Sequence, residues 1–318
     1  MKKILFLLCV FLLSQCKQKA SESKLNDSNF TEGEVIHYQY DESGRLVKER
    51  KVSYLLVGNK PDSLSFVTTY FYDKKGRKIK VEDHDGSDEL LSTTFFNYDS
   101  RDSLLAEYIV DTHGDTTTLV ENAYGENGNL HLNKHRQLLN TQSEDDLLNG
   151  KSNYDTLFTL TENFYQSGLL IRSTDRDVNN ALVVESEYKY DGQKLVKMEV
   201  YEFQDSKKQL RIANFYPNID KASGLERITV NILGDTIGVR RIEKHESGKV
   251  ARSIELDTEL GHAIITRHNL QGHIIEETFI IKDLGRKTIR RFSFDSSGRK
   301  IKEVSNDLPL TEEENKLL

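Results

Sequence analysis

The chain has 318 residues and a formal net charge of −7, and 30% of its residues are charged. Because the balance is acidic and Lys and Arg are spread along the whole chain, we expect no nucleic-acid partner. With 14 Tyr, 14 Phe and only three Pro, the composition favours an extensive, well-solvated β-sheet and argues against disorder.

The N-terminus has the pattern of a secretory signal peptide. Lys2 and Lys3 form a basic start, and residues 4–13 are apolar. Ten residues in a helix reach about 15 Å, half of the roughly 30 Å of a bilayer core, so a stable transmembrane span is not expected. We therefore predict that residues 1–15 are an export signal.

Residues 13–16, with the sequence LSQC, resemble a lipobox, the site at which bacterial lipoproteins are acylated on Cys and cleaved before it. The resemblance implies lipidation of Cys16, a flexible tether over residues 16–34 and attachment to a membrane of the cell envelope, at the outer membrane, through the lipid. The other cysteine, Cys9, lies inside the signal, so the folded part is expected to contain neither a disulfide nor a thiolate metal site.

One sequence unit recurs from residue 38 onward. YQYDESGRL at 38–46 returns as YFYDKKGRKI at 70–79 and as FSFDSSGRKI at 292–301. Tyr-x-Tyr places two aromatic side chains on one face of a strand, and Asp-x-x-Gly is typical of a tight turn that ends in a residue with positive φ. Weaker copies lie around Phe96, Tyr124, Phe164, Tyr188, Gly224, Gly248 and Gly272.

These units predict the fold class. Each copy reads as a β-hairpin, and residues 111–116 and 234–236 read as turns at the opposite end. A single hairpin is marginal in water, so the copies must pair side by side. We expect an all-β domain over residues 35–306, an extended antiparallel meander of about ten hairpins in a twisted or partly rolled sheet. Residues 134–153 and 203–219 are expected to be insertions, with a short helix at 144–148, and residues 307–318 a polar tail.

The Tyr-Asp-x-x-Gly-Arg-Leu/Ile core is similar to the YD repeat of RHS-type proteins. The similarity is clearest at residues 40–46, 72–79 and 294–301. RHS proteins build β-shells around toxins, or modules for adhesion at the cell surface. This chain is short for a shell and carries no effector domain after Asn306, so the resemblance implies a binding or scaffold role rather than encapsulation.

Candidate metal sites are few. Asp83 and Asp85 begin an alternation of oxygen-bearing residues like that of a calcium loop, but Gly86 stands at the fourth position rather than the sixth, and Thr94 replaces the final Glu. A charged hairpin tip is the simpler interpretation. His131 and His135 are four apart, which in a strand separates them by about 13 Å, too far for one zinc ion. We expect no metal and no other cofactor.

Catalytic motifs are similarly scarce. The sequence contains no nucleophile elbow, Walker loop or dinucleotide fingerprint. His268 occupies the place of Tyr40 in its repeat, and His245 is expected in a shortened turn before Gly248. We therefore expect a non-enzymatic protein. An envelope polysaccharide hydrolase with a hidden carboxylate pair and an RHS-like immunity or chaperone partner of a toxin are the alternatives.

The Tyr rows are the candidate binding residues. Tyr combines an apolar body with a polar tip and suits a protein or glycan ligand. The alternative is that the same side chains only hold the sheet together. The leading hypothesis is a lipid-anchored binding or scaffold module of the envelope, with contacts at Tyr38, Tyr40, Tyr70, Tyr72, Tyr188 and Tyr190.

Overall fold

The computed structural model describes residues 33–57, 60–140, 154–204, 207–217 and 224–312. The expected signal peptide, Cys16, nearly all of the expected tether and the helix expected at 144–148 lie outside the described residues. So do residues 313–318 of the expected C-terminal tail.

The described chain consists of β-strands, with one short 3-10 helix, η1 (Lys282–Leu284). The strands alternate in direction along the chain, and each holds 7–13 residues, lengths that suit a hairpin repeat. They are β1 (Gly33–Tyr40), β2 (Leu46–Val57), β3 (Lys60–Tyr72), β4 (Lys78–Asp85), β5 (Leu90–Tyr98), β6 (Leu104–Asp111), β7 (Thr116–Tyr124), β8 (Leu130–Asn140), β9 (Tyr154–Gln166), β10 (Leu169–Arg176), β11 (Leu182–Asp191), β12 (Lys194–Gln204), β13 (Lys207–Phe215), β14 (Leu225–Asn231), β15 (Thr236–Lys244), β16 (Val250–Asp257), β17 (His262–His268), β18 (Ile274–Ile281), β19 (Arg286–Phe294) and β20 (Lys300–Pro309).

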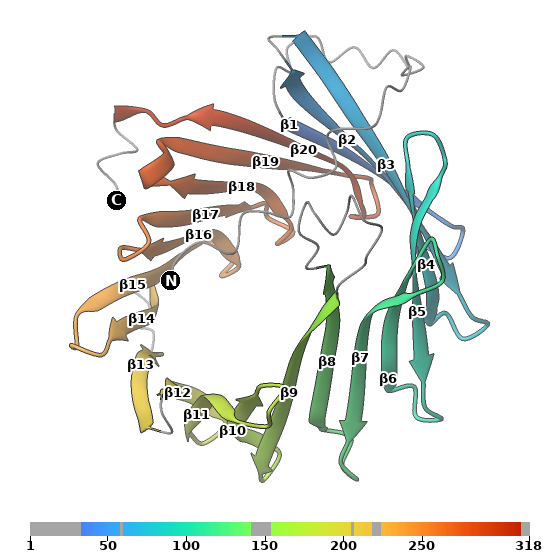
Figure 1. Cartoon of the computed structure of the whole chain (residues 1–318). Helices are drawn as coiled ribbons and strands as arrows, with labels where there is room; N and C mark the ends of the chain where they lie inside the picture. Colours follow the sequence, from blue (N-terminus) through green and yellow to red (C-terminus); the bar gives the residue numbers. More distant parts are fainter. Residues whose placement is uncertain (1–32, 58–59, 141–153, 205–206, 218–223, 313–318) are drawn as a thin grey trace.

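The strands form one antiparallel sheet of 20 strands that closes into a barrel (Figure 1). Each strand pairs with its neighbours in sequence, and β1 also pairs with β20, from Gly33 opposite Asn306 to His37 opposite Lys302. The expected antiparallel meander is confirmed, whereas the expected twisted or partly rolled open sheet is wrong. Closure removes the free edges that an open meander would expose to water and to other chains.

Two further expectations are corrected by the strand bounds. Residues 134–140 belong to β8, and residues 203–204 and 207–215 belong to β12 and β13. Much of the two expected insertions is therefore β-strand. β20 continues to Pro309, and the first residues of the expected tail are therefore strand.

The Asp-x-x-Gly turns form as the sequence indicates. In the turn between β1 and β2, the Asp41 amide donates to Arg45 O at 2.9 Å, and the Gly44 amide donates to Asp41 O at 2.9 Å. Gly44 has φ +79°, a value that favours glycine. The Asp41 carboxylate accepts the Arg45 amide at 2.8 Å, which closes the turn. Asp111 and Asn231 cap equivalent turns at the opposite end of the barrel.

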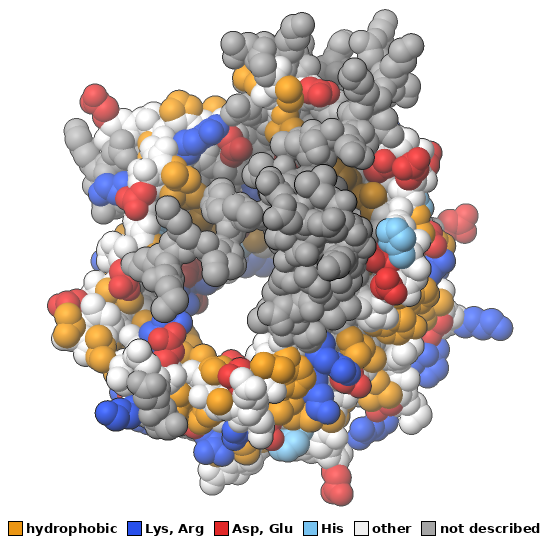
Figure 2. Space-filling view, in the orientation of Figure 1, with side chains coloured by type: hydrophobic (Ala, Val, Ile, Leu, Met, Phe, Trp, Pro, Cys, Tyr) orange, Lys and Arg blue, Asp and Glu red, His pale blue; other side chains and the backbone are white. Residues whose placement is uncertain are grey.

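The barrel is wide. Twenty strands spaced roughly 4.8 Å apart give a circumference of at least about 96 Å and a diameter of about 30 Å. Side chains cannot fill such a space from the wall, and the space-filling view keeps an opening within the ring (Figure 2). The most buried apolar side chains among the described residues are spread around the wall: Val35, Val81, Phe96, Ala213, Ala263 and Ile280. Contacts between neighbouring strands therefore stabilise the fold, in place of a central core.

Charged side chains stand on both faces of this wall. Successive residues of a strand point to opposite faces, so two adjacent charged residues put one charge on each face. Examples of such doublets are Arg50 and Lys51 in β2, Glu82 and Asp83 in β4, Arg240 and Arg241 in β15, Glu276 and Glu277 in β18, and Arg290 and Arg291 in β19. Within the described residues, no helix has the length and hydropathy needed to span a membrane.

Candidate functional site

In the repeats that have Tyr at the second aromatic position, this Tyr donates a hydrogen bond to the neighbouring hairpin. The Tyr72 hydroxyl, at the end of β3, donates to the backbone carbonyl of Leu46, the first residue of β2, at 2.6 Å. The same contact recurs around one end of the barrel, which we call the Tyr rim: Tyr40 to Lys300, Tyr98 to Lys78, Tyr124 to Leu104, Tyr165 to Leu130 and Tyr190 to Leu170, all at 2.8–3.0 Å. Three expected binding residues, Tyr40, Tyr72 and Tyr190, thus have a structural contact within the wall.

The Arg of the repeat links the turn to the same Tyr rim. Arg45 forms an ion pair with Asp41 at 2.7 Å, and its guanidinium lies 5.1 Å from the centre of the Tyr72 ring. Arg77 over Tyr98 and Arg299 over Tyr40 repeat this arrangement. The backbone amide of Arg45, followed by its side chain, holds the pKa of Asp41 below its usual range. Each of these turns is therefore held by an ion pair with its own Arg, and the same Arg contacts a Tyr ring of the next hairpin.

The first Tyr of the repeat lies deeper in the wall. Tyr38 donates to Glu303 Oε2 at 2.9 Å, and Glu303 also accepts Arg290 at 2.5 Å and Lys300 at 3.1 Å. Burial would raise the pKa of Glu303, which is 3% exposed, but the hydrogen bonds from Arg290, Lys300 and Tyr38 outweigh burial and lower it. Burial, together with Glu303, strongly raises the pKa of Tyr38. We call this cluster, where β1 meets β20, the seam.

Other repeats have different pairs of side chains at the positions equivalent to Tyr38 and Glu303. Tyr70 has a raised pKa, because of burial first and the neighbouring Glu49 second, so it resembles Tyr38 beside Glu303. In the next hairpin the equivalent residues are Phe96 and Val81, which are both buried. Polar Tyr thus occurs with Glu, and apolar Phe with Val, so each buried pair is matched in polarity.

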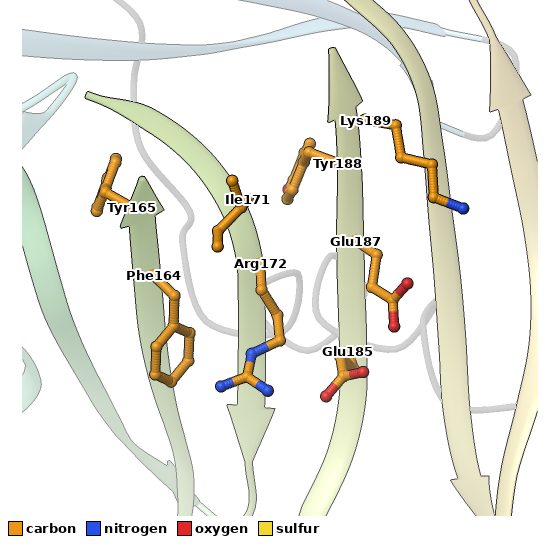
Figure 3. Close-up of a pocket in the computed structure, with 8 residues that line it drawn as sticks. All are labelled: Phe164, Tyr165, Ile171, Arg172, Glu185, Glu187, Tyr188 and Lys189. Atoms are coloured by element: carbon orange, nitrogen blue, oxygen red, sulfur yellow. The ribbon is translucent and has the colours of Figure 1, made fainter. Parts of the chain in front are cut away.

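A shallow depression on β9–β11, which we call the β9–β11 depression, is the candidate binding site (Figure 3). It has a volume of about 480 Å3 and brings together Phe164, Arg172, Glu187 and Lys189, with the expected Tyr188 beside them. Phe164 lies directly opposite Arg172, and Arg172 directly opposite Glu187. The Arg172 guanidinium is 4.0 Å from the centre of the Phe164 ring. The remaining lining residues are Tyr165, Ile171 and Glu185.

The two carboxylates that line the β9–β11 depression, and Glu199 on the adjacent strand β12, form ion pairs with lysines. Lys208 binds Glu185 at 2.5 Å and Glu187 at 2.6 Å. Lys189 binds Glu199 at 2.8 Å, and the hydrogen bonds from Lys189 and Lys197 lower the pKa of Glu199. Lys208 is therefore an ion-pair partner shared by the two acids that line the depression.

The candidate metal residues have local contacts instead. The Asp85 carboxylate accepts the amides of Ser87 and Glu89 at 2.8 and 3.0 Å and so caps a hairpin turn. His131 packs edge-on against Phe164. Throughout the part of the chain that the structure describes, no group of three or more His, Cys, Asp or Glu residues could hold a metal ion.

The two histidines of the late repeats lie in the sheet and its turns. His268 ends β17 in the place of Tyr40, and its ring contacts Gly272 O. The His245 amide donates to Lys249 O, and the Gly248 amide donates to His245 O. His245 therefore fills the Asp position of a full-length turn, and the expected shortened turn is wrong.

Sequence reasoning missed the pair formed by Phe164 and Arg172. The register between β9 and β10 shifts at a β-bulge between Leu170 and Arg172, which brings the two side chains opposite each other. A bulge changes which residues face one another but leaves no clear signal in composition or spacing. Tyr188, by contrast, was found through the Tyr-x-Tyr pattern.

Comparison with known proteins identifies no family. No family model and no curated protein matches the chain. Among solved structures, the chain is similar to a porin-like protein from Bacteroides uniformis, with a TM-score of 0.33 and 10% sequence identity over 88% of this chain and 96% of that chain.

The expected relationship to RHS-type YD-repeat proteins is wrong. No family model matches, that of any repeat family included, and the strands close on themselves into one barrel. The Asp-x-x-Gly sequence specifies a tight turn only. Such a turn is compatible with either an open array of hairpins or a closed ring.

Proposed function

We propose that the protein is a non-enzymatic, lipid-anchored protein of the cell envelope whose barrel binds a protein or glycan partner at the β9–β11 depression. The observation that carries the proposal is the row of half-buried Phe164, exposed Arg172 and half-buried Glu187 on adjacent strands of a closed wall. An aromatic ring beside both signs of charge offers stacking, hydrogen-bond donors and acceptors within one contact area.

The charge distribution supports anchoring by a lipid rather than by the barrel itself. A barrel that crosses a bilayer has an apolar outer band, and an Arg or Lys at the middle of that band costs roughly 2–4 kcal/mol. Doublets such as Arg240 and Arg241, or Arg290 and Arg291, place charge on both faces of this wall. The barrel is therefore suited to water on both sides, and the lipobox-like Cys16 would supply the membrane attachment.

A rigid wall favours binding without a large ordering cost. Each strand that carries the β9–β11 depression is hydrogen-bonded on both sides. The ion pair between Glu185 and Lys208 also restrains a side chain that lines the depression. A preformed surface of this kind loses little conformational entropy when a partner binds.

The test is partner capture with a matched variant. Detergent-solubilised envelope and a glycan array are probed with the full chain, with Phe164→Ala/Arg172→Ala, and with Arg101→Ala, an exposed arginine on a distant turn. We expect a partner that is retained by the full chain and by Arg101→Ala and lost with the double variant. Equal retention by all three, or recovery of no protein and no glycan, would overturn the proposal.

A further inference from the structure

A second hollow lies across β15–β18, on strands that the β9–β11 depression does not use. It has a volume of about 250 Å3, and Ala263 and Ile280, which are 2% and 1% exposed, are its most buried lining residues. Its apolar lining consists of Val239, Ile254, Leu256, Ala263, Ile265 and Ile280. We call it the β15–β18 groove.

The strand register explains why this groove is apolar. Val239, Leu256, Ala263 and Ile280 stand opposite one another across four strands and form one row. Ile254 and Ile265 form the next row on the same face, because residues two apart in a strand share a face. The result is a continuous aliphatic strip that is several side chains long.

Positive charge borders the strip. Arg241 lies opposite Ile254, and Arg252 is two residues from Ile254 on the same face. Arg252 contacts Glu243 at 3.7 Å, yet its Nε is buried without a hydrogen-bond partner. Among the described residues, Arg241 has no carboxylate within ion-pair distance, and its side chain is exposed.

The neighbouring row does not neutralise these arginines. Opposite Arg252 stands Arg267, whose partner Glu276, at 3.5 Å, is shared with Arg291 at 3.0 Å. Arginines therefore outnumber the carboxylates at this edge of the groove, although the whole chain has a net charge of −7. An aliphatic strip with arginines at one end is complementary to a molecule that has an apolar tail and an anionic head.

We propose that the β15–β18 groove binds a single-chain amphiphile with an anionic head, of the class of long-chain carboxylates. The tail lies along the row from Val239 to Ile280, and the carboxylate receives hydrogen bonds from Arg241 and Arg252. The inference goes beyond the proposed function and does not rest on it, because the two surfaces use different strands.

The experiment compares heads of different charge on the same tail. Dodecanoate and the neutral dodecanol are titrated into the full chain, into Arg241→Gln/Arg252→Gln and into the control Arg101→Gln, by calorimetry below the micelle concentration. We expect the full chain and the control to bind dodecanoate, and the double variant to lose about tenfold or more in affinity, the scale of one charge-assisted hydrogen bond. Dodecanol should bind more weakly than dodecanoate and be unaffected by the double variant.

A second variant tests the tail. Ala263→Leu adds a larger side chain at the most buried part of the groove and should abolish binding of both probes, provided that its circular dichroism is that of the parent. If Ala263→Leu does not fold, the comparison of the full chain with Arg241→Gln/Arg252→Gln tests the proposal on its own. Equal affinity for dodecanol and dodecanoate, unchanged affinity in the double variant, or binding to anionic vesicles without binding to free dodecanoate would each overturn the proposal.

Discussion

The hydroxyl of Tyr40, on the first strand, donates a hydrogen bond at 2.8 Å to the backbone carbonyl of Lys300, on the last strand. The same contact joins Tyr72 to Leu46 inside the chain. Arg299 also lies over Tyr40 as Arg45 lies over Tyr72. The junction that closes the barrel therefore uses the contacts of an internal junction, and no separate closing element is needed.

Tyr40→Phe should destabilise the barrel to about the same degree as Tyr72→Phe. Each change removes one hydrogen bond to a backbone carbonyl, which is worth about 0.5–1.5 kcal/mol. Urea unfolding followed by circular dichroism measures both variants. A loss for Tyr72→Phe with no loss for Tyr40→Phe would show that the first and last strands are not paired in solution.

A double-mutant cycle should reveal coupling at the seam. Glu303→Val leaves the Tyr38 hydroxyl and two cationic side chains without their buried partner, at a cost of about 1–3 kcal/mol. Adding Tyr38→Phe recreates the apolar pair seen at Phe96 and Val81, so the double variant should be less destabilised than the sum of the single variants. Additive losses in urea unfolding would contradict a direct contact between Tyr38 and Glu303.

Stability should fall at low pH. The folded protein lowers the pKa of Glu303, so the stability that this group contributes is present above its unfolded value of about 4.3 and is lost as the pH falls through the lowered pKa. The capped Asp41 and Asp295 act in the same direction. Thermal unfolding between pH 7 and pH 3 measures the effect, and Glu303→Gln should show a shallower decline. Identical slopes for the two proteins would contradict the role assigned to Glu303.

Stability should also fall at high pH. Burial raises the pKa of Tyr38, Tyr70 and Tyr188, so their contribution is complete below the unfolded value of about 10 and is lost as the pH rises above it. Tyrosinate absorbance should show a group of residues that ionises only when the barrel unfolds. Ionisation of every Tyr near pH 10 without loss of β-sheet would contradict their burial.

Gly76→Val should destabilise the turn between β3 and β4. Gly76 has φ +83°, where a β-branched side chain is strained by about 1–2 kcal/mol. Lys74→Val, an exposed position in the same turn, is the matched control and should have little effect on the melting temperature. Equal melting temperatures for the two variants would contradict the turn assignment.

Cys16→Ser should release the protein from membranes, because the serine hydroxyl does not replace the thiol in lipidation. Cys9→Ser is the control, since Cys9 lies within the signal peptide and should not affect the anchor. Fractionation after export measures both variants. Membrane retention of Cys16→Ser at the parental level would contradict the anchor.

The hairpins could be predicted from sequence because their determinants are local. Asp41 and Gly44 fix a turn within five residues, and Tyr-x-Tyr fixes the strand that enters it. Closure could not be predicted in this way, because the partner of Tyr40 lies 260 residues away and nothing near Tyr40 specifies it. For the same reason, the binding interpretation of Tyr40 did not reveal its structural contact.

The β9–β11 depression could be predicted only in part from the sequence. Tyr188 belongs to the repeat and was found by its spacing, but the bulge beside Arg172 set the register that brings Phe164 into the row. Similarly, the polarity match of Tyr38 with Glu303 depends on a diagonal contact across strands that are adjacent only after closure.

Because the closing junction has the same contacts as the internal ones, the circumference of the ring depends on how many copies of the unit the gene encodes. Duplication or deletion of one hairpin at the level of DNA would yield a wider or narrower cylinder in which Tyr40 still meets a carbonyl on the final strand. The diameter of such a barrel can therefore change in evolution while the contacts between its first and last strands stay the same.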